Sequence, residues 1–595
     1  MKKNYLIFTP INNTWPANYQ NYLSFVSESA ILNLDGKQNK YKSIYINSSR
    51  WKNKKIFGKD YHNLSNLFEK ILKILSKELN NIHEINNDQK TWRLILGPWL
   101  SMFIFVFFER YSNLKKIVKK KKIDKCIFLN FDKNLFVPYN NREFIHLASE
   151  DYWNQFFYQK LCENFIKKKK IEIIKAEKNK EFQKFKKNIK RGKYLNQNFG
   201  YPKNFLIRFL NLFNRKKYKY LFFGNNLGIK NEFNLSFKFN QFPTIGNIDN
   251  TFVNRKINEK LRKKIKKRLK FKNIFEDLCL KSICDFLPTL FLENYKDFKK
   301  YQENKNLPTS PKVVLLSHSL WFDTKFMYYI ANLLRNKKTK LIYCQHGGTY
   351  GLAAYNWLEK FEISIANIYL TWGWMNKINK NLKKFFILKN MKLNISRKKN
   401  LLVIMRNRFR YLYSMESSIS LESYSDYIFN ISTFLKNINN NVKEKTIIRM
   451  PQGTNKKHNF CEKLFEHHTF KNNKSFAKAC SESKLIIHTY NSTPFLETLS
   501  ANIPSILILD KNSNPFKKES RKLISNLEKN KILFFKMKEA ALFVNKLWNS
   551  NKINDWWNSK KTQNAINMFT NIYAKKTDDI PNEIKRIILS TTLKH

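Results

Sequence analysis

Two stretches decide the fold of this chain: Leu341-Ile-Tyr-Cys-Gln-His-Gly-Gly-Thr-Tyr-Gly351 and Leu485-Ile-Ile-His-Thr-Tyr-Asn-Ser-Thr-Pro-Phe-Leu-Glu-Thr-Leu-Ser-Ala-Asn-Ile-Pro-Ser-Ile506. In each, an apolar strand leads into a turn that can hold a ligand, and the second continues through a short helix into another strand. Doubly wound sheets bind their ligands outside the carboxyl ends of the strands. The two stretches therefore predict an α/β protein with two Rossmann-like domains that face each other across a cleft.

The residues around these stretches predict two series of strands and helices. Strands are expected at residues 5–9, 43–47, 125–129, 219–224, 312–316, 340–344 and 363–371, and again at 401–405, 446–450, 485–489 and 505–509. A polar, Lys- and Asn-rich segment from Asn376 to Lys399 separates the two series. We therefore expect a Rossmann-like domain with helical insertions at residues 1–390, a second Rossmann-like domain at 391–554, and a C-terminal helix at 555–595 that crosses back onto the first domain.

The composition is that of a globular protein with an unusual charge. The 595 residues carry a formal net charge of +66, and 43% of them are hydrophobic. Lys far outnumbers Arg, whereas nucleic-acid readers depend on Arg for bidentate contacts. Nucleic acid is therefore not an expected partner, and a basic nucleic-acid-binding protein is kept as an alternative of another class. The dense Lys-rich runs indicate a solvated surface or attraction to an anionic membrane surface.

Cysteines and apolar segments bear on the compartment. Seven scattered cysteines without CxxC spacing are typical of a reducing compartment. The N-terminus lacks the apolar run and cleavage site of a signal peptide. The apolar run from Leu94 to Phe108 is shorter than the ~20 residues of a spanning helix, so it predicts a buried helix, with a membrane-dipping hairpin as the alternative. A cytoplasmic protein is expected, with a peripheral place on the inner face of the cytoplasmic membrane left open.

The second stretch offers a place for an anion. Thr493 followed by Pro494 predicts a helix N-cap followed by proline at the first helical position. Free N–H groups and the helix dipole at this end favour a group such as a nucleotide diphosphate. Glu497, one turn further, can accept hydrogen bonds from sugar hydroxyls. In the alternative interpretation, Thr493 only caps the helix and Glu497 only complements its dipole.

The first stretch concentrates a scarce residue type. Three of the 13 glycines of the chain are Gly347, Gly348 and Gly351. Glycine after a strand allows positive φ and the close approach of a ligand to the backbone. His346 precedes them and could act as a general base towards an acceptor hydroxyl or donate to a phosphate or sugar. A histidine that hydrogen-bonds the backbone of a tight turn is an equal alternative.

Arginines follow the strands of the second series although Arg is scarce. Arg406, Arg408 and Arg410 follow residues 401–405, and Arg449 follows the strand that begins at residue 446. A pyrophosphate needs such partners, while a surface cation is the alternative for each. The candidate cleft-lining residues beside these cations are His318, Gln345, Tyr350 and Asn491.

Several motifs are missing from the sequence. There is no Asp-x-Asp, no GxGxxG and no GxxxxGK[ST], and no His or Cys cluster has zinc spacing. We therefore expect neither a metal nor a cofactor.

With these residues identified, the chain resembles a family of transferases associated with bacterial O-antigen and surface-polysaccharide gene clusters. The segments that carry the resemblance are Trp92–Leu100, Ser149–Asn154, Phe286–Tyr295, Trp321–Phe326, Gln345–Gly351, Thr371–Trp374, Tyr490–Pro504 and Asp555–Trp557. The pattern Ser-Thr-Pro-x-x-Glu followed by Ala-x-x-Pro-x-Ile also resembles the donor-nucleotide motif of GT-B glycosyltransferases, in which the glutamate position contacts the donor.

The resemblance implies a metal-independent, GT-B-like glycosyltransferase that moves a sugar from a nucleotide-activated donor to a surface-glycan acceptor of O-antigen type, free or lipid-linked. Residues 1–390 would then be the acceptor side and 391–554 the donor side. The residue patterns described above, rather than the resemblance, indicate five donor-binding residues: Ser492, Thr493, Glu497, Arg449 and Arg406. They also indicate His346 as the catalytic residue. A glycerophosphate or polyol-phosphate transferase of teichoic-acid type is the alternative.

Overall fold

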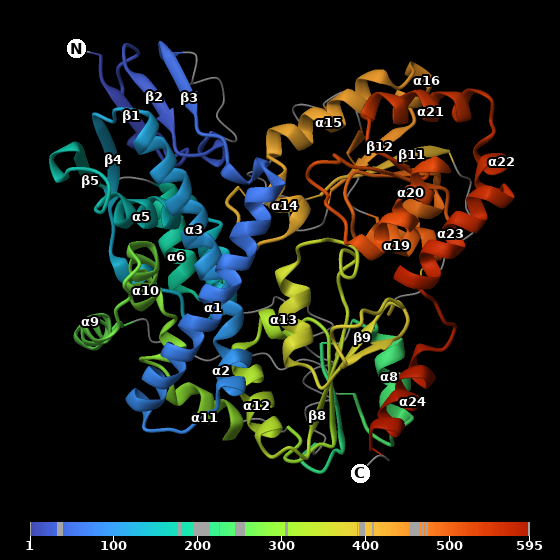
Figure 1. Ribbon diagram of the computed structural model, residues 1–595, viewed down its shortest axis with the longest axis horizontal. Coiled ribbons are helices and arrows are strands. Elements are labelled where there is room, and N and C mark those ends of the chain that lie inside the picture. Colours follow the sequence, from blue (N-terminus) through green and yellow to red (C-terminus); the bar gives the residue numbers. More distant parts are fainter. Residues whose placement is uncertain are drawn as a thin grey trace.

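A computed structural model describes residues 2–31, 40–176, 180–195, 215–224, 226–243, 256–303, 307–388, 391, 399–406, 410–450, 465, 469–470 and 474–592. Figure 1 shows three α/β units, with the first at the N-terminal end, the second around β8 and β9, and the third around β11 and β12. Arg408 lies outside the described residues, as do residues 389–390 and 392–398 of the predicted boundary segment 376–399.

The first unit is built on a parallel five-stranded sheet with the order β3-β2-β1-β4-β5. Its strands are β1 (Asn4–Ile7), β2 (Tyr22–Phe25), β3 (Ser43–Ile46), β4 (Lys125–Asn130) and β5 (Ile171–Lys175). Its helices are α1 (Lys54–His83), α2 (Gln89–Ile95), α3 (Gly97–Lys120), α4 (Asn141–Ala148), α5 (Asp151–Cys162), α6 (Lys180–Lys190), α9 (Glu259–Arg268) and α10 (Ile274–Phe286).

The second unit contains the first of the two deciding stretches. Its parallel sheet has the order β10-β9-β8-β7-β6. The strands are β6 (Tyr220–Phe222), β7 (Val313–Leu316), β8 (Lys340–Cys344), β9 (Ile368–Thr371) and β10 (Leu382–Lys384). The helices are α8 (Ile229–Phe237), α11 (Lys296–Glu303), α12 (Thr324–Arg335) and α13 (Trp357–Ile365), and the 3-10 turn η8 (Ser319–Trp321) follows β7.

The third unit contains the second stretch. Its parallel six-stranded sheet has the order β13-β12-β11-β14-β15-β16. The strands are β11 (Asn400–Ile404), β12 (Thr446–Arg449), β13 (Thr469–Phe470), β14 (Ser483–His488), β15 (Ser505–Ile508) and β16 (Leu533–Phe534). The helices are α14 (Ser417–Leu421), α15 (Tyr424–Asn437), α16 (Asn440–Lys443), α18 (Phe476–Ser481), α19 (Thr493–Ser500), α20 (Arg521–Lys529), α21 (Met537–Asn549), α22 (Ile553–Asn558) and α23 (Lys560–Tyr573).

The predicted parallel α/β architecture is confirmed, but residues 1–390 contain two sheets rather than one sheet with helical insertions. Central strands such as β7 are buried along their whole length and read as apolar runs, whereas β3 and β5 lie at sheet edges and stay partly exposed. The predicted strand at 363–371 is wrong in its first part, because α13 continues to Ile365 and β9 begins at Ile368.

The long apolar run of the first unit is a buried helix. Trp99, Phe103 and Phe107 of α3 are fully buried, and Phe103 packs against rings of α4, α5 and α10. Within the described ranges, no single helix is long and apolar enough to cross a membrane. The pair α2 and α3, bent by 66°, meets the length and composition criteria together. Packing inside the protein accounts for its apolar character.

The C-terminal helices connect the third unit to the second. Lys575 N–H, just after α23, donates to Trp372 O at 3.0 Å. The next helix, α24 (Ile580–Thr592), buries Ile580, Ile584 and Ile588 in the core of the second sheet and packs on α8. The end of the chain therefore fastens one unit to the other.

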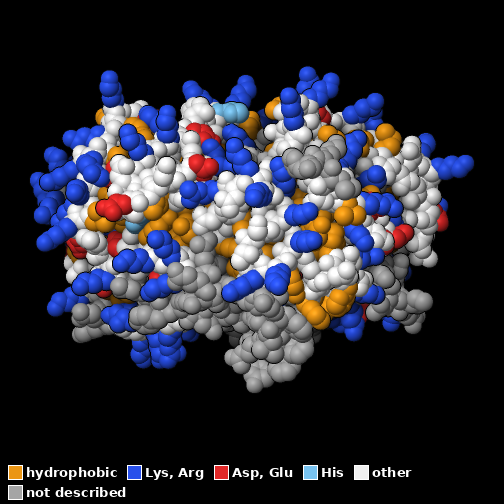
Figure 2. All heavy atoms as spheres, turned by 90° about the horizontal axis from the view of Figure 1, so that it is seen from below, with side chains coloured by type: hydrophobic (Ala, Val, Ile, Leu, Met, Phe, Trp, Pro, Cys, Tyr) orange, Lys and Arg blue, Asp and Glu red, His pale blue; other side chains and the backbone are white. Residues whose placement is uncertain are grey.

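The chain carries a net charge of +66. Figure 2 shows Lys and Arg side chains over most of the face that it presents, with few Asp or Glu side chains among them. On this face the charge does not form one compact patch such as a nucleic-acid groove requires.

An ion pair joins the first unit to the third. Arg410 Nη1 donates to both carboxylate oxygens of Asp151 at 2.7 and 2.6 Å, and Tyr411 donates to the same group at 3.0 Å. Because both charged side chains are largely buried, Asp151→Ala should lower the free energy of unfolding by about 3 kcal/mol. Thermal unfolding should show a lower Tm for this variant, and the double variant Asp151→Leu with Arg410→Met should recover much of the loss. Equal Tm values for wild type and Asp151→Ala would contradict the assigned role of the pair.

Candidate functional site

The two deciding stretches touch each other. Gly348 N–H, in the turn after β8, donates to Thr493 Oγ1 at 3.1 Å. A Cβ atom on Gly348 would lie 2.4 Å from both Ser492 C and Thr493 N. The turn of the second unit is therefore seated directly on the start of α19, with no groove between them at this point.

This contact corrects the predicted helix cap. Ser492, with extended backbone, is the N-cap of α19, and Thr493 is the first helical residue rather than the cap. The Thr493 hydroxyl is turned to the glycine turn instead. Because Pro494 has no N–H and Gly348 covers the amide of Thr493, the helix end is largely occupied by the protein's own backbone.

The three glycines are needed for close packing within the protein. Only Gly351 has positive φ, at +76°, and a Cβ there would lie 2.5 Å from the Trp374 ring. A Cβ on Gly347 would lie 2.8 Å from the Tyr350 ring. The sequence correctly indicates a close approach to this turn, but the approaching groups are protein atoms.

His346 is paired with a carboxylate that the sequence analysis missed. His346 Nε2 lies 2.7 Å from Glu362 Oε1. Glu362, on α13, is completely buried and also accepts hydrogen bonds from Trp321 Nε1, Tyr350 OH and Tyr369 OH at 3.0 to 3.1 Å. These donors hold the carboxylate in place, so the histidine ring is oriented by a rigid partner.

The pair changes the acidity of the histidine. Burial alone would lower the pKa of His346, but the charge of Glu362 and its hydrogen bond outweigh burial and raise the pKa above the ordinary value of 6.5. Glu416, from the third unit, raises it further. The His346 side chain keeps 19% of its surface exposed, so a ligand can reach it.

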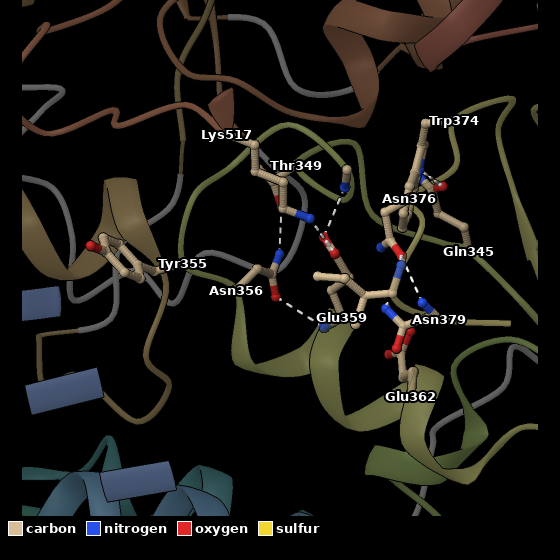
Figure 3. Close-up of polar contacts among 12 residues, drawn as sticks. Gln345, Thr349, Tyr355, Asn356, Glu359, Glu362, Trp374, Asn376, Asn379 and Lys517 are labelled. Atoms are coloured by element: carbon tan, nitrogen blue, oxygen red, sulfur yellow. Dashed lines mark hydrogen bonds and ion pairs between the residues drawn. The ribbon is translucent and has the colours of Figure 1, made fainter. Parts of the chain in front are cut away.

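A polar network holds the turn between α13 and the third unit (Figure 3). Glu359, buried on α13, accepts Gly351 N–H at 2.7 Å and pairs with Lys517 at 2.5 Å. Asn356 caps α13 by accepting Glu359 N–H at 3.1 Å and donates to Thr349 Oγ1 at 2.9 Å. The backbone of the turn is therefore fixed by groups from both units.

Two of the predicted cleft-lining residues belong to this framework. Gln345 is fully buried, and its Oε1 accepts from Trp374 Nε1 at 2.8 Å and from Trp372 N–H at 3.0 Å. Tyr350 is buried against Glu362. Both predictions of cleft lining are wrong, because these polar groups are satisfied inside the protein.

Two neighbouring hollows lie beside the contact, at the carboxyl edge of the third sheet. The first, of about 300 Å³ including its opening, lies between the second and third units, and its polar lining residues are Thr349, Asn356, Glu416, Ser417, Asn491 and Asn514. The second, of the same size, lies within the third unit, and its polar lining residues are Glu422, Tyr427, Asn430, Thr489 and Asp510. Residues 416–422, 489–491 and 510–514 run from one hollow to the other.

The predicted cations have different positions. Arg406 and Arg449 stand at the carboxyl ends of neighbouring strands β11 and β12. Arg406 pairs with Glu422 at 2.7 Å and stacks on Tyr427, and its buried Nε has no partner among the described residues. Arg449 Nη1 donates to Lys474 O at 2.8 Å. Arg410 instead pairs with Asp151, away from this edge.

The remaining candidates lie around the junction. The His318 ring centroid is 6.4 Å from that of His346. Glu497 is half-buried on α19, one turn after Thr493. Across the residues that the structure describes, no three His, Cys, Asp or Glu side chains gather as a metal site would require.

Replacing Glu362 by Gln tests the pair. Without the carboxylate charge, burial should bring the pKa of His346 below its ordinary value of 6.5. A group with a raised folded-state pKa stabilises the fold below its unfolded pKa and loses that contribution as the pH rises through the folded value. Wild type should therefore lose this stabilisation as the pH rises from 6.5 through the raised pKa of His346, and Glu362→Gln should lack it. Histidine NMR titration measures the pKa directly, and an unchanged pKa in the variant would refute the pairing.

Gly348→Ala tests the contact between the units. The new methyl group would press on the backbone of Ser492 and Thr493, which cannot rotate away, so a loss of about 1–3 kcal/mol of stability is expected. Gly347→Ala is the matched control, because its methyl group meets only the Tyr350 side chain. Chemical denaturation should show the larger loss for Gly348→Ala, and the reverse order would place the contact elsewhere.

Solved structures that resemble the chain share little sequence with it. No curated protein matches the chain in sequence. UDP-N-acetylglucosamine 2-epimerase from Rickettsia bellii is 12% identical with a TM-score of 0.34, over 63% of this chain and 97% of the epimerase. MurG from Acinetobacter baumannii is 12% identical with a TM-score of 0.29, over 52% and 79% of the two chains. The wall teichoic acid polymerase TagF is 11% identical with a TM-score of 0.27, over 51% and 85%.

These structural likenesses are too low to carry a conclusion about activity. The family profile is different, because it covers almost the whole sequence. The profile of the LIC12162 family transferases matches residues 4–588, and the chain belongs to that family.

Proposed function

We propose that this transferase is a glycosyltransferase that moves a sugar from a nucleotide-activated donor to a surface-glycan acceptor. The observation that carries the proposal is the pair of adjoining hollows at the carboxyl edge of the third sheet, with the His346–Glu362 pair facing that edge from the second sheet. Parallel α/β sheets bind ligands at this edge.

The donor extends along the edge in this proposal. The hollow beside Tyr427 takes the nucleoside, because it offers an aromatic ring together with the acceptors Glu422 and Asp510. The hollow beside Thr349 and Asn491 takes the sugar, because its lining is rich in amide and hydroxyl groups. The diphosphate crosses residues 489–491 between them.

Fixed charges stabilise the leaving diphosphate. Arg406 lies beside the second hollow, through its contacts with Glu422 and Tyr427, and its buried Nε has no partner within the described part of the chain. Arg449 adds a second positive charge from the neighbouring strand. Ser492 and Glu497 follow the crossing segment and supply a hydroxyl and a carboxylate for the donor, while the Thr493 hydroxyl stays engaged with Gly348.

His346 acts on the acceptor. Its Nε2 faces Glu362, so Nδ1 is the nitrogen left to take the proton of an acceptor hydroxyl. The acceptor oxygen then forms a bond to the anomeric carbon as the bond to the diphosphate breaks, and the diphosphate leaves with the electron pair. Glu362 stabilises the imidazolium that results. The Lys-rich surface suits work in the cytoplasm at an anionic membrane, where a lipid-linked acceptor would be presented.

A nucleotide screen tests the donor half of the proposal. UDP, GDP, CDP and CMP are added separately, and the nucleotide that matches the donor should raise Tm. At a concentration one hundred times its Kd, it should add about 2.7 kcal/mol to the free energy of unfolding. Arg406→Gln should weaken the binding of this nucleotide about tenfold, while the exposed control Arg586→Gln should not.

His346→Ala and Glu497→Ala should abolish transfer and keep the fold.

The outcomes separate the alternatives. Stabilisation by CDP alone, with turnover of a CDP-linked polyol, would favour glycerophosphate or polyol-phosphate transfer. No stabilisation by any nucleotide, or wild-type turnover in both His346→Ala and Glu497→Ala, would overturn the proposal.

A further inference from the structure

Helix α4 of the first unit reaches the carboxyl edge of the second sheet. Asn140 caps it by accepting Glu143 N–H at 3.0 Å. Asn141, almost fully buried, donates through Nδ2 to Trp321 O at 2.8 Å, which fastens the helix to the turn η8 after β7. The next residue, Arg142, is thereby held with its guanidinium 5.4 Å from the centroid of the Phe322 ring.

Arg142 is half-buried, and its surroundings differ from those of the buried Arg262. Arg262 holds Glu293 through two hydrogen bonds of 2.7 and 2.8 Å. Within the described ranges, Arg142 makes no hydrogen bond and no ion pair, and its Nε is shielded from solvent. Asp323 lies near enough to act on its charge, but that carboxylate accepts Phe326 N–H at 3.0 Å as the cap of α12. The guanidinium fork is therefore left without a matching acceptor.

The side chains of Phe322, His318 and His346 form a row that leads from Arg142 to the candidate site. The centroid of the exposed Phe322 ring lies 6.5 Å from that of His318, and the His318 centroid lies 6.4 Å from that of His346. His146, one turn after Arg142 on the same face of α4, feels its charge. The row Arg142, Phe322, His318 and His346 thus combines one permanent cation, two imidazoles and an aromatic face.

We infer that this row binds a phosphate group of the acceptor, an inference that rests on the proposed function for the identity of the occupant. The planar fork of an arginine matches two phosphate oxygens, and imidazole N–H groups add further donors. Phe322 gives the group attached to the phosphate an apolar surface. The row ends at His346, so a phosphate held at Arg142 would bring the rest of the acceptor towards the proposed base.

This site is separate from the proposed donor site. The donor cations Arg406 and Arg449 stand on the third sheet, whereas Arg142 comes from the first unit and His318 from the second. A phosphoryl group of this kind occurs on soluble sugar phosphates and on lipid-linked diphosphates alike. The shared chemistry is the phosphoryl group, and the probes below distinguish its two sources.

Calorimetry with simple probes tests the inference. Inorganic pyrophosphate, farnesyl diphosphate and farnesol are titrated into the full-length protein at about 150 mM salt, where long-range charge effects are screened. Arg142→Gln should weaken both diphosphates about tenfold. Arg586→Gln, which removes the same charge from an exposed position on α24, should not. Arg142→Lys should give an intermediate affinity, since an ammonium group cannot bind two phosphate oxygens as a guanidinium does. This variant replaces Arg142→Gln in the test if Arg142→Gln does not fold.

Each outcome decides the matter. Tighter binding of farnesyl diphosphate than of pyrophosphate supports a lipid-linked acceptor, and equal binding supports a soluble one. Equal affinities in Arg142→Gln and Arg586→Gln, or equal binding of farnesol, overturn the site. UDP affinity should be unchanged in Arg142→Gln, and a parallel loss would assign Arg142 to the donor instead. If wild type binds no nucleotide, the proposed function fails, while Arg142-dependent binding of pyrophosphate would still establish the phosphate site.

Discussion

The close approach of the Gly348 backbone to the first residues of α19 is the constraint on which the rest of the site depends. Any side chain at this position would have to displace the main chain of Ser492 or Thr493. With glycine there, the carboxyl edges of the second and third sheets come together without an intervening layer of side chains. The hollows on the third sheet and the histidines on the second then lie on either side of one junction.

Buried carboxylates make this junction rigid. Glu362 accepts hydrogen bonds from Trp321, Tyr350 and Tyr369 and pairs with His346. Glu359 links the backbone of Gly351 to Lys517 of the third unit. Burying an ionised group is costly unless it is paired and hydrogen-bonded, and each of these groups is both. In the proposed reaction, these fixed groups would provide the preorganised environment that the transferred proton requires.

The sequence predicts much of this arrangement and misses parts of it for physical reasons. Central strands such as β8 and β14 are apolar along their length, and glycines and Thr493-Pro494 mark the turns, so the two stretches are recognisable. The first sheet is missed as a separate unit because its strands in residues 1–175 are short, and its edge strands β3 and β5 are partly exposed and lack a continuous apolar run. Glu362 is missed because a single glutamate in a helix resembles any surface residue until the fold buries it.

The role of the glycines shows where sequence reasoning reaches its limit. A glycine-rich turn after a strand indicates that something comes very close to the backbone, but it does not say what comes close. Here the neighbour is another part of the same chain, so the anion site expected at the end of α19 is largely filled. Two guanidinium groups each keep an Nε without an acceptor among the described residues, and these are the positions at which we propose ligands. They belong to Arg406 on the third sheet and to Arg142 at the edge of the second. Arg406 comes from the third unit and Arg142 from the first, so the two proposals together describe a reaction between two anionic substrates that meet at His346.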